Sequence, residues 1–172
     1  MAVLSILTYP DPALKEIARP VDKISDEIKK LAEDMVQTMY EAPGSGLAAP
    51  QVGWNCRLIV MDDSTADDLG RPLIVVNPEI VSAKGDFVFE EGCLSVIDYY
   101  AKVKRAAEVV VRGKNLDGRT MEYRASGRKA VVFQHEIDHL DGILFIDRIS
   151  GLKRDLYRRR LKKMMRQEKD GK

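Results

Sequence analysis

The sequence contains little cysteine and no long apolar run. These two features argue against a disulfide-rich fold and against a membrane-spanning protein. Its 172 residues include two cysteines, Cys56 and Cys93. Two are too few for a fold held together by disulfides, so we expect both thiols to be reduced. No apolar run approaches the roughly 20 residues that cross a bilayer, and the first residues lack the basic start of a signal peptide. We therefore expect a cytoplasmic protein that is not bound to a membrane.

The sequence also has little net charge. The balance is +1, which by itself gives no reason to expect nucleic-acid binding, least of all specific DNA binding. The charge is unevenly distributed, however. Residues 148–172 contain 11 Lys or Arg and 3 Asp or Glu, whereas residues 1–147 contain 17 and 24. A basic end on an acidic body fits either a solvated helix face or docking on a polyanion, and the sequence leaves both open.

The composition, 45% apolar and 32% charged, is that of an ordinary folded domain, and we expect residues 1–172 to form one domain. Apolar residues that recur every three or four positions predict helices over about 25–42 and 152–168. Gly127 and Gly142 mark the start and stop of a further helix over about 128–140. Ser25 is a favourable N-cap for the first helix. The last helix is basic, with Leu152, Leu156 and Leu161 along one side.

Short apolar stretches separated by turn residues predict strands between the first two helices. The candidates are Cys56–Met61, Pro72–Asn77, Glu79–Ser82, Asp86–Glu90, Ala101–Lys104, Glu108–Arg112 and Met121–Ala125. Asp117-Gly118, between the last two, predicts a hairpin turn. A run of strands flanked by helices indicates an α+β fold, in which mostly antiparallel short strands pack around the second helix.

Both histidines of the chain stand in one short motif, His135-Glu136-Ile137-Asp138-His139. On a helix, residues four apart lie one turn apart on the same face, so the two imidazoles can bind one metal ion. Glu136 lies one step round the helix, where its carboxylate could reach a water molecule beside the metal. The spacing predicts a metal-dependent hydrolase whose central helix carries the metal.

Two histidines do not complete a catalytic metal site, which usually has three protein ligands and one open position. The sequence has no third histidine, so the third ligand must be a Cys, Asp or Glu from elsewhere. Cys93 is the better candidate because it lies in a loop-like segment between predicted strands, where a thiolate can be presented. Cys56 begins an apolar strand and is better explained as a small buried hydrophobic residue.

Three segments, in this order along the chain, resemble the three motifs of peptide deformylases. They are Gly44-Ser45-Gly46-Leu47-Ala48-Ala49-Pro50-Gln51, Glu91-Gly92-Cys93-Leu94-Ser95 and Gln134-His135-Glu136-Ile137-Asp138-His139-Leu140-Asp141-Gly142. The resemblance covers nearly the whole chain. One departure follows the second motif: where many relatives have a proline, this chain has Ile97-Asp98-Tyr99-Tyr100. In the family this segment is a loop that borders the substrate cleft.

The resemblance implies a metal centre and a substrate. Cys93, His135 and His139 would hold one divalent ion, natively Fe²⁺, although Zn²⁺, Ni²⁺ or Co²⁺ could occupy the same site. The ligand chemistry alone would suggest Zn²⁺. The substrate would be the N-formylmethionyl end of a nascent peptide, and the products would be formate and a free amine.

The resemblance also implies the catalytic groups. A metal-bound water would attack the formyl carbon, while Glu136 acts as general base and then as general acid. The side-chain amide of Gln51 and the backbone N–H of Leu94 would stabilise the negative oxygen that develops.

Three further residues would support the metal ligands. Glu91 would pair with Arg105, as the family pattern suggests. Asp138 would either orient a ligand histidine or be an ordinary solvated helix residue, and the sequence favours neither.

Five residues would border the substrate. Val131 and Val132 would form an apolar wall for the methionine side chain, and plain core packing is the alternative. Gly44, Ser45 and Gly46 would let the backbone approach the substrate, and a flexible loop is the alternative there.

Two other functions share part of this pattern. A zinc peptidase that cuts internal bonds has the His-Glu-x-x-His helix but needs neither of the other two segments. A structural metal site in a binding protein would need a fourth ligand. For the basic helix at 152–168 we expect docking on the ribosome, near the place where the nascent chain emerges.

Overall fold

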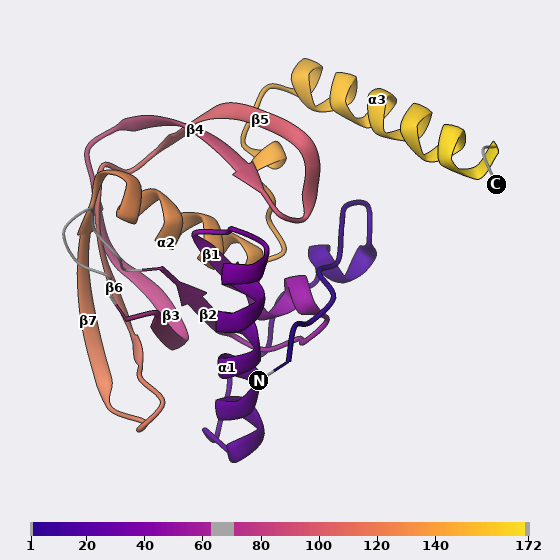
Figure 1. Cartoon of the computed structure of the whole chain (residues 1–172). Coiled ribbons are helices and arrows are strands. Elements are labelled where there is room, and N and C mark those ends of the chain that lie inside the picture. The colour runs from indigo at the N-terminus through magenta and orange to yellow at the C-terminus, as the bar shows by residue number, and fades with distance from the viewer. Residues whose placement is uncertain (1, 63–70, 171–172) are drawn as a thin grey trace.

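The computed structural model of the chain describes residues 2–62 and 71–170, and the side chains of all of these except 168–170 (Figure 1). Its helices are α1 (Asp26–Glu41), α2 (Gly127–Leu140) and α3 (Gly151–Asp170), with short 3-10 turns η1 (Pro12–Lys15), η2 (Ala49–Val52) and η3 (Phe145–Asp147). Its strands are β1 (Gly46–Ala48), β2 (Leu58–Met61), β3 (Leu73–Lys84), β4 (Phe87–Cys93), β5 (Val96–Arg105), β6 (Glu108–Lys114) and β7 (Thr120–Ser126). The predicted α+β class is confirmed.

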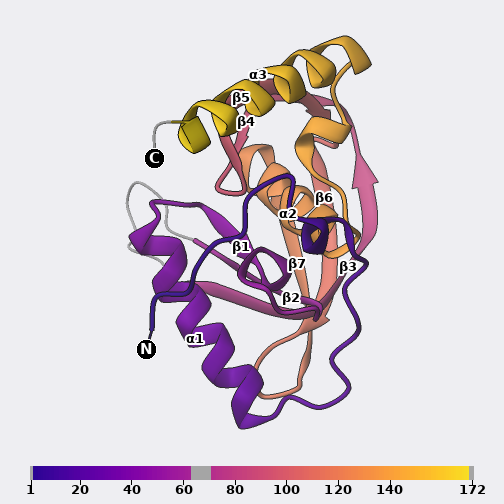
Figure 2. The ribbon, with the colours of Figure 1, turned by 90° about the vertical axis from the view of Figure 1, so that its right-hand side faces the viewer.

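The strands form two antiparallel sheets. The larger has the order β1-β2-β3-β6-β7, and the smaller is the ribbon β4-β5. Helix α2 lies between the ribbon and the larger sheet, whereas α1 packs on the side of β1 and β2 (Figures 1 and 2). This arrangement makes α2 the central helix, as the sequence predicted.

One face of α2 is apolar and fixes the helix on the larger sheet. Ala130, Phe133, Ile137 and Leu140 recur three or four residues apart, are buried, and pack in one cluster with residues of β2, β3 and β6. Burial of each large side chain of this kind stabilises the fold by about 1.5–3 kcal/mol. The opposite face of α2, which carries the histidines, is thereby turned toward the ribbon β4-β5.

The first helix follows its sequence signals. The Ser25 hydroxyl accepts a hydrogen bond from the Ile28 N–H at 3.4 Å, as an N-cap does. The predicted hairpin turn is also present, with Gly118 at φ +81° between β6 and β7. Glycine adopts this left-handed conformation at little cost.

The prediction of two strands at 72–77 and 79–82 is wrong, because the chain forms the single strand β3 through Pro78. The register against β6 shifts between Val76 and Glu79 and again between Ile80 and Ser82. A bulge leaves a residue unpaired, which accommodates a proline that cannot donate to the ladder.

Two further segments differ from expectation around the predicted site. Cys93 is the last residue of β4 rather than part of a loop, and it pairs with Val96 across the turn. The stretch Ile97–Tyr100 belongs to β5, although a loop was expected there. Strand β1 was not predicted, because its Gly46–Ala48 segment is too short to reveal an alternating pattern and is defined by pairing with β2.

Helix α3 lies beside the ribbon β4-β5 (Figure 2) and buries only part of the leucine stripe that the sequence predicted. Tyr157 and Leu161 are buried, and the Tyr157 ring lies 4.6 Å from that of Tyr99 in β5. Leu152 and Leu156 remain 72% and 55% exposed. Aromatic packing onto β5, rather than the leucine stripe, orients this helix. None of the helices in the described residues is both long and apolar enough to cross a membrane.

Candidate metal centre

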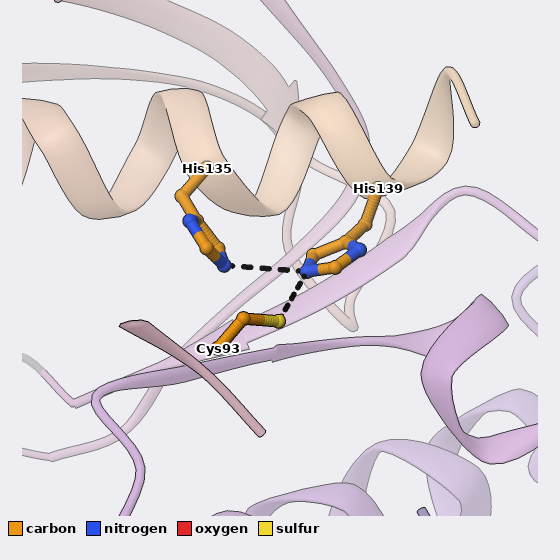
Figure 3. A group of neighbouring side chains, drawn as sticks. All are labelled: Cys93, His135 and His139. Atoms are coloured by element: carbon orange, nitrogen blue, oxygen red, sulfur yellow. Dashed lines mark hydrogen bonds between the residues drawn. The ribbon is translucent and has the colours of Figure 1, made fainter. Parts of the chain in front are cut away.

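Three side chains from two elements converge beside α2 (Figure 3). His135 and His139 stand one turn apart on α2, and Cys93 approaches from the end of β4. The Cys93 Sγ lies 3.3 Å from Nε2 of His139, which lies 3.3 Å from Nε2 of His135. All three atoms are within 4.8 Å of one another and could hold a metal ion.

The donor set fits one divalent ion. Ligands at about 2.0–2.3 Å from a tetrahedral ion lie roughly 3.3–3.6 Å from one another. The two separations of 3.3 Å that involve His139 agree with this geometry. One thiolate and two imidazoles suit iron or zinc better than magnesium or calcium, which prefer oxygen. The side chain chosen from the sequence, Cys93, is the one in the group. Cys56 is elsewhere: it is partly buried against the core cluster below α1, and desolvation raises the pKa of its thiol to about 11.

The protonation of the two histidines differs. Burial and the nearby charges of His135 and Arg105 hold the pKa of His139 well below its usual value. Burial would also lower the pKa of His135, but hydrogen bonds to Cys93 and Glu91 raise it well above its usual value. A cation bound by this group would compete with the proton on His135.

Glu91 fixes the orientation of the His135 ring. Its Oε2 lies 2.8 Å from Nδ1 of His135, so the ring's other nitrogen faces Cys93 and His139. Arg105 donates to both oxygens of Glu91, at 2.7 and 2.9 Å. Burial would raise the pKa of Glu91, but the hydrogen bonds from Arg105 and His135 lower it to about 2. The pairing of Glu91 with Arg105 expected from the family pattern is thus present.

Asp138 is buried rather than solvated, and its carboxylate accepts hydrogen bonds from two arginines. Its Oδ2 accepts from Nη1 of Arg105 at 2.5 Å and from Nε of Arg148 at 2.5 Å. Its Oδ1 accepts from Nη2 of Arg148 at 2.6 Å. Asp138 therefore acts on the histidines only through Arg105. Sequence reasoning missed Arg148, since nothing in its local pattern marks it.

Glu136 lies inside the site with a strongly altered acidity. Burial raises the pKa of its carboxyl group to about 7, with a smaller opposing effect from His135. Among the described residues, its Oε2 is buried without a hydrogen-bond partner. A buried carboxylate oxygen with an unused acceptor position is suited to a water molecule or a substrate proton.

The glycines of the first motif lie in close contact with side chains of the site. A Cβ on Gly46 would lie 2.4 Å from Oε1 of Glu136, and one on Gly44 would lie 2.9 Å from Cδ1 of Leu94. Both distances are too short for any other residue without displacement of the neighbour. Gly46 thus allows the Glu136 carboxylate to occupy its position.

Gln51 is buried in η2 and its amide is held at both ends. Its Oε1 accepts from the Ala48 N–H at 2.9 Å, and its Nε2 donates to Oγ of Ser95 at 3.1 Å. The same Nε2 lies 3.6 Å from Sγ of Cys93. Leu94 and Ser95 form the turn between β4 and β5, directly after Cys93. Sequence reasoning did not single out Ser95, although it stands in the second motif.

A cavity of about 530 Å³ opens beside these groups. One face of α2 lines it, because positions 128, 131, 132, 135 and 136 follow the helical spacing of three and four. The five residues expected to border the substrate all line this cavity: Gly44, Ser45, Gly46, Val131 and Val132. Tyr99 and Tyr100 of β5 line it as well. Val131 is buried, and Val132 also packs against the core cluster beneath α2.

The chain is similar to known proteins over nearly its whole length. A family model described as polypeptide deformylase matches residues 3–155. A peptide deformylase of Syntrophobacter fumaroxidans is 51% identical over 97% of this chain and 98% of its own. One from Alkalilimnicola ehrlichii is 50% identical over 97% and 93%.

Solved structures agree with these sequences. A peptide deformylase from Legionella pneumophila has a TM-score of 0.89 at 45% identity and covers 97% of this chain and 98% of its own. One from Ehrlichia chaffeensis in complex with actinonin has a TM-score of 0.89 at 38% identity, over 95% and 98%. These similarities confirm the family that the three motifs indicated: the chain belongs to the polypeptide deformylase family.

Proposed function

We propose that this chain removes the formyl group from the N-terminal formylmethionine of nascent polypeptides, as one catalytic domain spanning residues 1–172. The observation that carries the proposal is the Cys93-His135-His139 group at the end of a cavity, beside a buried Glu136 whose pKa is raised to about 7. Nascent chains arise in the cytoplasm of bacteria, and we propose that the protein acts there.

Glu136 is proposed as the proton carrier. When bound by the three ligands, a divalent cation supplies Lewis acidity and makes water nucleophilic near neutral pH. Glu136 accepts the proton of the attacking water and passes it to the departing amine nitrogen. A carboxyl pKa of about 7 suits both halves of this task, because the group both gains and releases a proton near neutrality.

Gln51 and Leu94 are proposed to stabilise the oxygen of the formyl group as it becomes negative. The Gln51 amide is held by Ala48 and Ser95, so its N–H groups need no reorganisation during the reaction. The backbone N–H of Leu94 is the second donor. Donors fixed in a buried site are worth more than donors in water, because the surrounding dielectric constant is low.

The methionine side chain is proposed to lie along Val131 and Val132. Both residues line the cavity one helical turn from His135 and Glu136. An unbranched apolar side chain can pack against these two valines without leaving a polar group unpaired. Gly44, Ser45 and Gly46 form the facing edge, along which the peptide backbone would run.

We propose Fe²⁺ as the native ion, with Zn²⁺, Ni²⁺ or Co²⁺ able to replace it. A thiolate ligand suits Fe²⁺ as well as Zn²⁺, and the family resemblance favours iron. Metal analysis after purification without oxygen tests this. Iron in close to equimolar amount is expected, and zinc alone in such a preparation would contradict it.

The activity is tested by comparing formyl-Met-Ala with an N-terminally blocked peptide that offers only internal bonds. Formate release from the first and no cleavage of the second are expected. Cleavage of internal bonds would instead favour the zinc peptidase. Glu136→Gln, which preserves shape but removes the titrating group, serves as the inactive control.

The basic helix α3 is proposed to dock on the ribosome. The support is its excess of Lys and Arg, together with the exposed Leu152 and Leu156, which leave one side of the helix open to a partner. Replacement of the exposed Arg159, Lys162 and Lys163 by glutamine leaves the buried Tyr157 and Leu161 in place. It should weaken cosedimentation with ribosomes while leaving hydrolysis of a short formyl peptide largely intact, and equal ribosome affinity of this variant would refute the docking.

A further inference from the structure

A continuous series of ion pairs runs from the segment before α3 to a histidine of the metal centre. It begins at Arg148, passes through Asp138, Arg105 and Glu91, and ends at His135. Every link is a charged hydrogen bond between 2.5 and 2.9 Å. We propose that Arg148 is a positioning residue, which holds the metal ligand His135 in place through this series.

Asp138 joins the two arginines of the series, Arg148 and Arg105. Its side chain is 9% exposed and receives hydrogen bonds from two guanidinium groups. Arg148 uses two of its nitrogens on the two oxygens of Asp138, at 2.5 and 2.6 Å. This bidentate contact fixes the plane of the carboxylate as well as its position. Arg105 therefore meets an acceptor that cannot rotate.

Arg105 transfers this constraint to the metal centre. It is buried and uses Nε and Nη2 on Glu91 and Nη1 on Asp138. If the Arg148 side chain is removed, Arg105 is the remaining cationic partner of Asp138 in the series. The Asp138 carboxylate can then rotate, and Arg105 can shift with it. Any displacement of Arg105 is passed to Glu91, because the two are joined by two hydrogen bonds, and then to the His135 ring.

Arg148 is also the member of the series that solvent reaches. Its side chain is 40% exposed, whereas those of Arg105, Glu91 and Asp138 are 2%, 3% and 9% exposed. It lines a cavity of about 380 Å³ that is separate from the catalytic one and includes Lys84 and Lys104. The support of His135 thus extends to the surface at one residue, three positions before α3 begins.

The expected consequence is weaker retention of the metal ion. Substitution of a residue that orients a metal ligand typically lowers metal affinity 10- to 100-fold. Arg148 acts through intervening groups, so we expect a loss near the lower end, about tenfold, for Arg148→Met. Arg148→Lys keeps the charge and one hydrogen bond but loses the bidentate contact, and should lie between Arg148→Met and the wild type.

The test uses the full-length, Zn²⁺-loaded protein and measures zinc affinity by competition with a chromogenic chelator. The matched control is Arg57→Met. Arg57 donates to Asp141 at 2.7 Å and to the carbonyl oxygen of Leu140, at the end of the same helix, but has no link to the series. Zinc affinity should fall in the order wild type, Arg148→Lys, Arg148→Met, with Arg57→Met at the wild-type value.

A second measurement separates positioning from simple loss of stability. In the Co²⁺-loaded protein, the visible absorption bands report ligand geometry, and they should shift for Arg148→Met but not for Arg57→Met. For formyl-Met-Ala, kcat should fall with little change in KM. Wild-type zinc affinity in both Arg148 variants, or an equal loss in Arg57→Met, would overturn the proposal. If Arg148→Met fails to fold, Arg148→Lys against Arg57→Met decides by the same criteria.

Discussion

Replacement of Glu136 by glutamine should change how the stability of the metal-free protein depends on pH. The carboxyl group is 4% exposed, and burial raises its pKa to about 7 from an ordinary 4.5. A group whose pKa is raised in the folded state stabilises the fold while it is protonated. Its contribution is complete below pH 4.5 and is lost as the pH rises through 7.

The size of the effect follows from the difference between the two pKa values. Each pKa unit corresponds to about 1.4 kcal/mol, so 2.5 units correspond to about 3 kcal/mol over the whole range. Between pH 5 and pH 8.5 the wild type should lose roughly 2.5 kcal/mol through this group. Glutamine does not titrate, so Glu136→Gln should not show this loss.

The assay is urea unfolding of chelator-treated wild type and variant at pH 5 and pH 8.5. The quantity of interest is the free energy of unfolding of Glu136→Gln minus that of the wild type, because this difference removes the contributions of groups such as His139, whose pKa does not depend on Glu136. It should become more positive by about 2–3 kcal/mol from pH 5 to pH 8.5. A difference that does not vary with pH would refute the argument that burial raises the pKa of Glu136.

Three further outcomes are expected. Gly46→Ala should lower kcat for formyl-Met-Ala about a hundredfold with little change in melting temperature. The added Cβ would lie 2.4 Å from Oε1 of Glu136 and would displace this flexible carboxylate. An unchanged kcat would contradict the packing argument. Gln51→Ala should lower kcat by about 10²–10³ in stopped formate assays, since one oxyanion donor is lost, and a change in KM alone would argue against that role. Glu91→Gln should flatten acid denaturation: the pKa of Glu91 is lowered to about 2, so its contribution is present above pH 4.5 and is lost as the pH falls toward 2, by about 3 kcal/mol in all. The measurement is acid unfolding of wild type and variant, monitored by circular dichroism. Parallel unfolding curves for the two proteins would contradict this prediction.

Much of the fold could be predicted because its signals are local. The Ser25 cap, the Gly118 turn and the extent of α2 between Gly127 and Gly142 each depend on a few neighbouring residues, and all three are found where the sequence predicted them. The single strand β3 could not be predicted, because Pro78 ends a strand by local rules. It is accommodated by a bulge against β6, which is a distant part of the chain.

The metal helix was determined by the sequence alone. Four residues make just over one helical turn, so His135 and His139 must lie on one face of any helix that contains them. The three motifs likewise identified the family, because residue types at fixed spacing do not depend on knowledge of the fold. Cys93 was the preferred third ligand on the same grounds.

Tertiary structure alone decided the distances and the electrostatics. Cys93 lies 46 residues before His139, and only the packing of β4 over α2 brings its sulfur to 3.3 Å. The raised pKa of Glu136 results from burial under residues of other elements. The role of Arg148 depends on where η3 leads the chain back past Asp138. Local spacing fixes which residues share a face, whereas burial and long-range contacts depend on how distant segments pack, and no short pattern encodes that.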